Sequence, residues 1–150
     1  MNEMGEACRA LARPGPAALA TLGTGEVLGA PYVSLVLVAW DAHLRPLLLL
    51  SSLAEHTKNL EVDDRASLLI TAEGSEPLAA SRMTLVGRCG ALAEAEADTA
   101  RQVFVSSHPS AAGYATFRDF RMYRFELETI RLVAGFGRQA WVAPSDFLRG

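Results

Sequence analysis

The sequence predicts a mainly β fold of the α+β class, in which six strands close into an antiparallel barrel with short flanking helices. Six or so strand-length segments follow one another mostly in hairpin order, so they should pair largely antiparallel. Helical segments are few and short, whereas a regular α/β sheet would need a helix after nearly every strand. A small barrel is the economical closure because it removes exposed strand edges.

The first 40 residues predict a helix followed by two strands. A short helix at 2–12 is stopped by the prolines at positions 14 and 16. A strand at 17–22 leads into Gly-Thr-Gly-Glu at 23–26, which is typical of a hairpin turn. Residues 31–40 are apolar at nearly every position, which indicates a long strand.

Strands and helices then alternate less regularly. The elements expected from residue 47 to residue 120 are a strand at 47–50, a helix at 53–62, strands at 65–72 and 81–92, a loop at 73–77, a helix at 93–105 and a helical turn or two within 110–120. Gly87 and Gly90 mark points where the strand at 81–92 should bulge or bend.

The last strand carries the clearest pattern. Residues 123–128 alternate aromatic or apolar side chains with charged ones, the two-residue period of a half-buried strand. The apolar residues stand at odd-numbered positions up to Leu127 and at even-numbered positions from Ile130 to Leu132. This slip predicts a β-bulge near residues 128–129.

Composition indicates a single folded domain at 1–150. Half of the residues are hydrophobic and 21% are charged, which argues against disorder. The net charge of −3 and the absence of a basic run exclude a general affinity for nucleic acid. The mean hydropathy of +0.16 is high for a small monomer and favours an apolar surface buried against another subunit.

Targeting and metal signals are weak. No apolar run approaches the roughly 20 residues of a membrane-spanning helix, and no signal peptide is visible at the acidic N-terminus. Cys8 and Cys89 have no metal-type spacing, so we expect free thiols and no metal site. These features favour a cytoplasmic protein that does not enter a membrane.

The strongest functional signal lies where the strand at 47–50 gives way to a helix. Ser52 and Glu55 have the spacing of a capping box, which predicts that the helix begins beside Ser52. The first turn then carries His56 and Lys58, the chain's one lysine. A helix N-terminus with hydroxyls and a cation suits a phosphate. The alternative is that Ser52 caps an ordinary helix whose polar face meets water.

Several segments resemble the FMN-binding split β-barrel proteins of the pyridoxamine-phosphate-oxidase-like superfamily, most closely the haem-utilisation (HugZ-type) branch. The segments that carry the resemblance are 18–22, 31–35, 47–60, 66–70, 81–88 and 133–142. The most specific are the Ser/His-Thr-x-Asn element in 51–59 and the Gly-Phe-Gly…Trp element in 135–141. The resemblance implies an FMN-binding split barrel with its core at about 17–142.

The resemblance also implies a set of cofactor-binding residues. They are Val33, Ser34, Leu35, Ser51, Ser52, His56, Thr57, Lys58, Asn59, Arg82, Gly137 and Trp141. Residues 33–35 match the strand that passes along the flavin ring, and residues 51–59 match the surroundings of the phosphate and ribityl chain. Ser52, Thr57, Lys58 and Arg82 are therefore expected to converge on one anion site.

Gly137 and Trp141 match a stretch that reaches a flavin across a dimer interface. The resemblance therefore implies a homodimer with the cofactor at the interface. A surface ion pair for Arg82 remains an alternative to phosphate binding. A place in the dimer core remains an alternative to flavin contact for Trp141.

Three functions remain open. The first is an FMN-dependent oxidoreductase acting on a small molecule, because no residue is marked as a dedicated acid, base or nucleophile and the cofactor would carry the chemistry. The second is a haem-binding or haem-degrading protein, although the sequence stops at Gly150, before the extra C-terminal domain of many haem-utilisation proteins. The third is a non-catalytic flavin-binding module.

Overall fold

The computed structural model describes residues 2–73, 80–135 and 137–150. Seven strands in these ranges form one antiparallel sheet in the order β3-β2-β1-β4-β5-β6-β7, and an additional β3–β6 pairing closes six of them into a barrel. The strands are β1 (Gly15–Leu22), β2 (Pro31–Trp40), β3 (Pro46–Ser51), β4 (Arg65–Thr71), β5 (Arg82–Ala91), β6 (Phe120–Val133) and β7 (Gln139–Val142). The predicted six-stranded antiparallel split barrel is confirmed.

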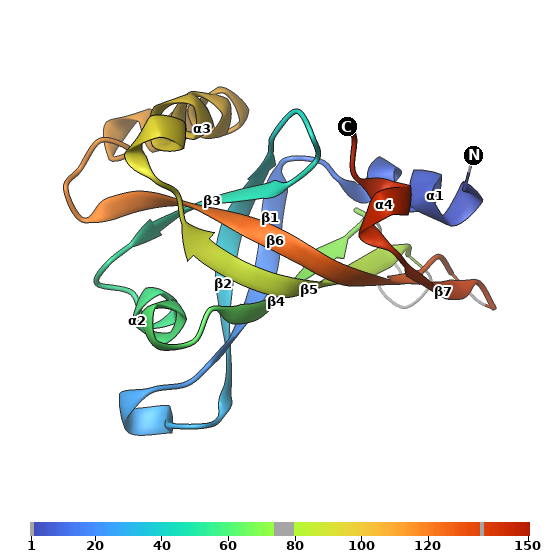
Figure 1. The fold of residues 1–150 in the computed structure, drawn as a ribbon, viewed down its shortest axis with the longest axis horizontal. Helices are drawn as coiled ribbons and strands as arrows, with labels where there is room; N and C mark the ends of the chain where they lie inside the picture. Colours follow the sequence, from blue (N-terminus) through green and yellow to red (C-terminus); the bar gives the residue numbers. More distant parts are fainter. Residues whose placement is uncertain (1, 74–79, 136) are drawn as a thin grey trace.

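Short helices flank the barrel at its ends (Figure 1). They are α1 (Glu3–Leu11), η1 (Gly25–Val27), α2 (Glu55–Val62), α3 (Glu94–Ser107), η2 (Pro109–Gly113) and α4 (Pro144–Phe147). Helices α1 and α4 lie together near both termini, whereas α2 and the tip of the β1–β2 hairpin lie at the other end. No helix in the described ranges is long and apolar enough to cross a membrane.

The barrel interior is filled by the inward side chains of alternating strands. Leu19, Leu68, Leu85 and Phe125 have no exposed surface, and each comes from a different strand. The same cluster includes Cys8 and Leu11 of α1 and Phe147 of α4. A smaller cluster lies under α3; it consists of Ala39, Leu47, Ala100, Phe104, Ala111 and Met122.

Strand β6 changes partner along its length, and this change splits the barrel. Its first part, from Phe120 to Arg124, pairs with β3, and its last part, from Ile130 to Val133, pairs with β7. Between them the pairing with β5 skips Glu128, because Val86 faces Thr129 and Gly87 faces Leu127. The predicted bulge near 128–129 is therefore confirmed.

Two local predictions are wrong. The capping box is absent, because α2 begins at Glu55 after the N-cap Ala54, which provides no side-chain cap. The chain first makes a turn, with Ala54 N–H donating to the Ser51 carbonyl, so Ser52 lies outside the helix. The tight hairpin turn at 23–26 is instead an eight-residue connection that contains η1.

The other predicted helices and strands occur within a few residues of their expected limits. Strand β7 and helix α4 were not predicted as separate elements. Most of the loop expected at 73–77 and Phe136 of the Gly-Phe-Gly element lie outside the described residues.

Candidate functional site

The barrel opens between β2 and β3. The two strands pair only at Ala39–Leu47 and Trp40–Pro46, after which β3 turns to pair with β6. A pocket of about 300 Å³ occupies this opening. It is lined by Leu35, Val36, Leu37, Leu49, Leu50, Ser51, Ala54, His56, Phe104, Tyr114 and Phe120. Its walls are mainly aliphatic and aromatic, with few polar side chains, which is the usual character of a small-molecule site.

His56 and Ser34 meet at this pocket from two elements. The Ser34 Oγ lies 2.9 Å from the His56 Nδ1. Burial lowers the pKa of His56 below its usual 6.5 because desolvation disfavours the imidazolium. The ring is therefore neutral at pH 7. Its Nε2 has no hydrogen bond to a described residue, and the half-buried ring lines the pocket.

The predicted ring-contact residues of β2 divide between its two faces. The side chains of Val33 and Leu35 are exposed on the outer face, whereas Ser34 points to the side of α2. Leu35 also lines the pocket, whereas Val33 does not. A flat ligand in the opening would therefore meet the β2 edge beside Ser34.

Ser51 and Ser52 lie at the end of β3 beside a carboxylate that the sequence did not single out. Ser51 Oγ donates to Asp119 Oδ2 at 3.2 Å and accepts from the Leu53 N–H at 3.2 Å. Ser52 N–H donates to the Asp119 carbonyl at 2.7 Å. The Asp119 charge disfavours a phosphate at the Ser51 hydroxyl. This contact joins β3 to the start of β6, so only the fold reveals it.

The start of α2 alternates between inward and outward side chains. Thr57 and Asn59 are buried, whereas Lys58 is exposed and lies 3.6 Å from Glu55. The Asn59 Oδ1 accepts from the Thr24 backbone and hydroxyl at 3.1 and 2.8 Å. Because the side chains of Thr57 and Asn59 are covered by protein, an external ligand reaches His56 and Lys58 but not these two.

Arg82, Gly137 and Trp141 form a second group at the far end of the barrel. Arg82 pairs with Thr71, at the end of β4 that lies away from α2, about 20 Å of extended chain from its start. Trp141 is exposed and its ring lies 5.2 Å from the guanidinium of Arg131. One chain therefore does not bring Arg82 to Ser52, Thr57 and Lys58.

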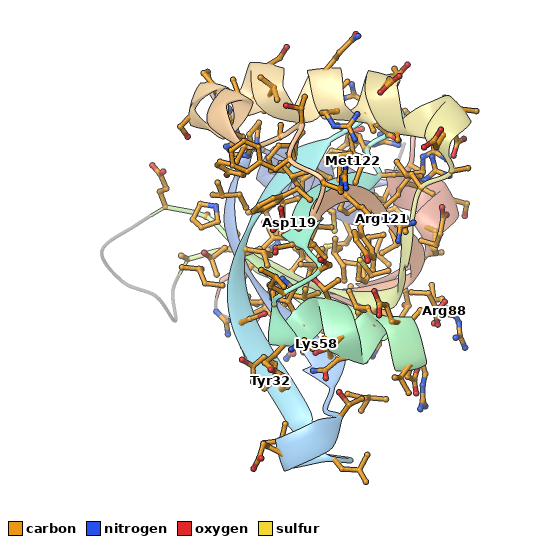
Figure 2. The ribbon with its side chains drawn as sticks, turned by 90° about the vertical axis from the view of Figure 1, so that its left-hand side faces the viewer. Tyr32, Lys58, Arg88, Asp119, Arg121 and Met122 are labelled. Atoms are coloured by element: carbon orange, nitrogen blue, oxygen red, sulfur yellow. The ribbon has the colours of Figure 1, made fainter. Side chains whose placement is uncertain are left out.

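Arg121 is a cation at the start of β6 that the sequence prediction did not include. Figure 2 shows Lys58, Asp119 and Arg121 on one side of the molecule, at α2 and the start of β6. Arg121 is exposed and follows the pocket residue Phe120, so its side chain lies on the opposite face of β6. There it lines a separate cavity with Glu94 and Asp98 of α3. Its place could not be found from the sequence, since the β3–β6 pairing that brings it here is long-range.

The outer face of the sheet is apolar. Register places Leu35, Ala18 and Leu69 in one row across β2, β1 and β4. Leu35 is 78% exposed, and Val33, Leu37 and Leu69 are also exposed. We call Val33, Leu35, Leu37 and Leu69 the outer apolar face.

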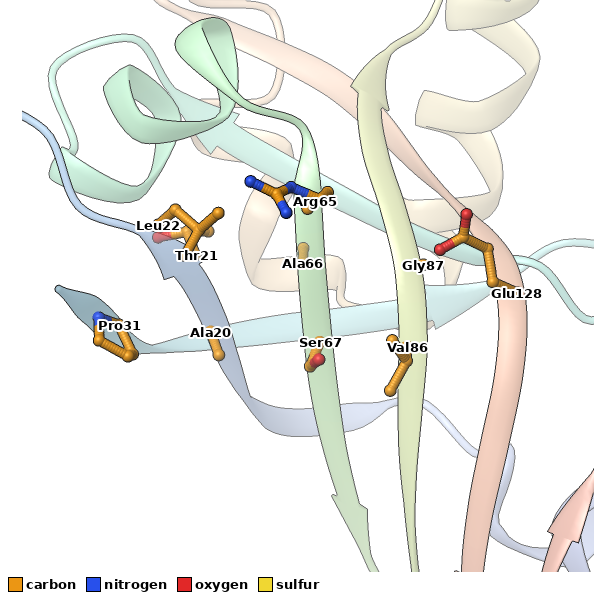
Figure 3. A pocket seen from close by; sticks show the side chains of 10 residues that line it. All are labelled: Ala20, Thr21, Leu22, Pro31, Arg65, Ala66, Ser67, Val86, Gly87 and Glu128. Carbon is orange, nitrogen blue, oxygen red and sulfur yellow. The ribbon is translucent and has the colours of Figure 1, made fainter. Parts of the chain in front are cut away.

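A second pocket, of about 280 Å³ (Figure 3), includes Ala20, which pairs with Val33 of the outer apolar face. Its lining residues are Ala20, Thr21, Leu22, Pro31, Arg65, Ala66, Ser67, Val86, Gly87 and Glu128. Its small side chains come from β1, β4 and β5, and Arg65 and Glu128 lie at its edges in the close view. Arg65 bonds to Asp63, which lowers the pKa of that carboxyl to about 2.

Two named proteins with more than 30% identity to this chain are haem proteins. The chain is 37% identical over 119 residues to the chloroplastic non-canonical heme oxygenase HOZ of Arabidopsis thaliana, over 79% of this chain and 36% of that protein. The structure of a heme-binding protein from Mycobacterium smegmatis superposes with a TM-score of 0.89 at 31% identity. That match covers 98% of this chain and 60% of the mycobacterial one. The chain thus spans about a third and three fifths of these two relatives.

A more distant structure shares the fold. HutZ, the heme storage protein of Vibrio cholerae, is 19% identical with a TM-score of 0.65, and the match covers 95% of each chain. At this identity the likeness concerns the split barrel alone. The family model described as "CREG, beta-barrel" matches residues 6–149, nearly the whole sequence. This chain belongs to the CREG-type β-barrel family.

Proposed function

We propose that this protein binds haem, as a haem-utilisation protein, in the opening between β2 and β3. The observation that carries the proposal is the neutral, half-buried imidazole of His56 at an apolar pocket. The plant heme oxygenase and the mycobacterial heme-binding protein, both above 30% identity, support the same ligand. The main expectation from the sequence was FMN, and haem was its alternative.

The residues of the opening fit the chemistry of haem. A porphyrin needs apolar contact over a flat surface, and Leu35, Leu37, Phe104 and Phe120 supply it. Its carboxylates need a cation, which Lys58, exposed in the first turn of α2, offers. When bound, haem would supply iron chemistry tuned by its ligands and by the polarity of the pocket.

We also propose that a second copy of the chain completes the site. A pocket of about 300 Å³ lies at the lower limit of ligand sites, so it encloses only part of a haem. The outer apolar face supports burial against a partner. In a two-fold dimer, Arg82, Gly137 and Trp141 of one protomer could approach the opening of its partner, which one chain does not allow.

FMN is the second candidate for the same opening. Exposed Ser52 and Lys58 near the start of α2 favour a phosphate there. The Asp119 carboxylate and the burial of Thr57 and Asn59 leave fewer groups for that phosphate than the sequence predicted. An FMN-dependent oxidoreductase therefore has weaker support than haem binding.

A titration of the purified protein distinguishes the two ligands. We expect added haemin to give a shifted Soret band that saturates at a fixed haem-to-chain ratio. Added FMN should leave the flavin fluorescence unquenched. The proposal would be overturned if the protein quenched the fluorescence of added FMN while added haemin kept the Soret band of free haemin. Iron released after reduction in air would identify degradation in addition to binding.

A further inference from the structure

We infer that the Nε2 of His56 would bind the haem iron and that Ser34 orients the ring for this role. The inference rests on the proposed function and assigns a chemical task to two residues of this chain. Its basis is the arrangement of the imidazole between the pocket and the Ser34 hydroxyl.

The hydrogen bond between Ser34 and the His56 Nδ1 decides which ring nitrogen is available. Metal-binding histidines commonly donate their second ring N–H to an oxygen, which fixes the tautomer and the ring orientation. The Ser34 Oγ, 2.9 Å from Nδ1, can accept a hydrogen bond from the Nδ1–H. The free lone pair is then on Nε2, the nitrogen without a hydrogen bond. This neutral imidazole is the form that binds a metal.

The other two histidines are placed for other contacts. His43 lies in the β2–β3 turn, where its Nδ1 is 3.1 Å from the Arg149 carbonyl. His108 has its Nε2 2.9 Å from the Val38 carbonyl, and its ring packs at a tilt against Phe104, with 5.0 Å between the ring centroids. Neither lines the pocket in the opening. The chain has three histidines, so His56 is the imidazole of this pocket.

Cysteine and tyrosine side chains are weaker candidates than His56 for binding the haem iron. Cys8 and Cys89 are fully buried, and burial raises their pKa values to about 11 and about 12. They are protonated thiols away from the opening. Tyr114 does line the pocket. A Tyr114→Phe variant therefore belongs in the test, because a phenolate ligand gives a different spectrum from an imidazole.

The experiment is a haemin titration with resonance Raman spectra of the ferrous complex. Wild type, His43→Ala and Tyr114→Phe should show an iron–histidine stretching band, and His56→Ala should lose it. Added imidazole should restore a nitrogen-ligated spectrum in His56→Ala. Ser34→Ala should keep the band and bind haem about 10–100-fold more weakly, as expected when the partner of a metal-binding histidine is removed.

The outcomes separate this inference from the proposed function. A wild type without a shifted Soret band overturns both. A haem-loaded His56→Ala protein that keeps the iron–histidine band overturns the ligand assignment alone. If His56→Ala does not fold, as judged by circular dichroism, His56→Gln takes its place, because glutamine keeps a polar side chain of similar size and cannot give that band.

Discussion

Asn59 shows how one residue fixes the arrangement of the candidate site. Its Oδ1 accepts two hydrogen bonds from Thr24, and its Nδ2 donates to the Thr21 hydroxyl at 3.0 Å. These bonds tie α2 to the β1–β2 hairpin. Because His56 lies one turn earlier on the same helix, Asn59 helps to hold the imidazole near Ser34.

Replacing Asn59 with alanine should lower the free energy of unfolding by about 1–3 kcal/mol, since buried partners lose their hydrogen bonds. Urea denaturation measures the change. A double-mutant cycle with Thr24→Ala provides the control, because residues that share hydrogen bonds couple by about 0.5–3 kcal/mol. Additive losses would show that the two residues do not stabilise each other.

Thr57 presents the opposite case, a buried hydroxyl with no hydrogen-bond partner among the described residues. Thr57→Val keeps the shape and removes the unsatisfied group, so it should raise the free energy of unfolding by about 1 kcal/mol. Thr99→Val on the exposed surface of α3 is the control and should change stability by less than about 0.5 kcal/mol. A selective loss of FMN affinity in Thr57→Val would instead assign the hydroxyl to a phosphate.

The lowered pKa of His56 predicts a pH dependence of stability. In the unfolded chain the imidazole has its ordinary pKa of 6.5, whereas burial lowers the pKa in the folded protein. The unfolded state therefore binds more protons than the folded state as the pH falls through about 6.5. The free energy of unfolding decreases over the same range. Urea unfolding at pH 7.5 and 5.0 should show a larger acid loss for wild type than for His56→Gln. Equal losses would contradict the assignment.

At the scale of elements, the bulge in β6 depends on a glycine in β5. A Cβ added at Gly87 would lie 2.0 Å from the Glu126 carbonyl oxygen, which is a backbone atom that cannot turn aside. Strand β6 carries the extra residue Glu128 beside this contact, where the register with β5 shifts between Val86 and Gly87. The missing side chain allows this close approach.

Gly87→Ala should therefore lower the free energy of unfolding by about 1–3 kcal/mol, the cost of overpacking. Gly90→Ala in the same strand is a matched control, because nothing lies within 4 Å of its added Cβ. Thermal or urea unfolding of the two variants side by side gives the comparison. Similar free energies of unfolding for both variants would mean that β6 can move away from the added methyl group without a loss of stability.

At the scale of the molecule, the outer apolar face predicts a homodimer. An isologous interface on this face should bury on the order of 2,000 Å² or more in total. Light scattering should give twice the 16.1 kDa of one chain. Leu35→Asp should give monomers, because a carboxylate would be buried in an apolar interface.

Val62→Asp is the control for this prediction. Val62 is 75% exposed, close to the exposure of Leu35, but it lies on α2 and outside the outer apolar face. This variant should remain dimeric. A monomer mass for wild type at micromolar concentration would contradict the homodimer, and a dimeric Leu35→Asp protein would place the interface elsewhere.

The sequence by itself determined the antiparallel barrel and most of its strands. The alternation in 123–128 and the slip to Ile130 predict β6 and its bulge, because a strand has a fixed two-residue period. Strand β2 occurs at the predicted residues 31–40. The pattern at Ser52 and Glu55 failed, because a turn bonded to Asp119 competes with the local cap.

The tertiary structure decided which predicted site residues can act together. The sequence selected His56 and Ser34, but their hydrogen bond requires α2 to pack beside β2. It could not place Asp119 beside Ser51, because the β3–β6 pairing joins residues about 70 positions apart. It could not show that Asn59 is buried, because inward and outward side chains of α2 are set by the strands against which the helix packs. Local patterns fix periods and turns, whereas long-range pairing fixes which groups meet.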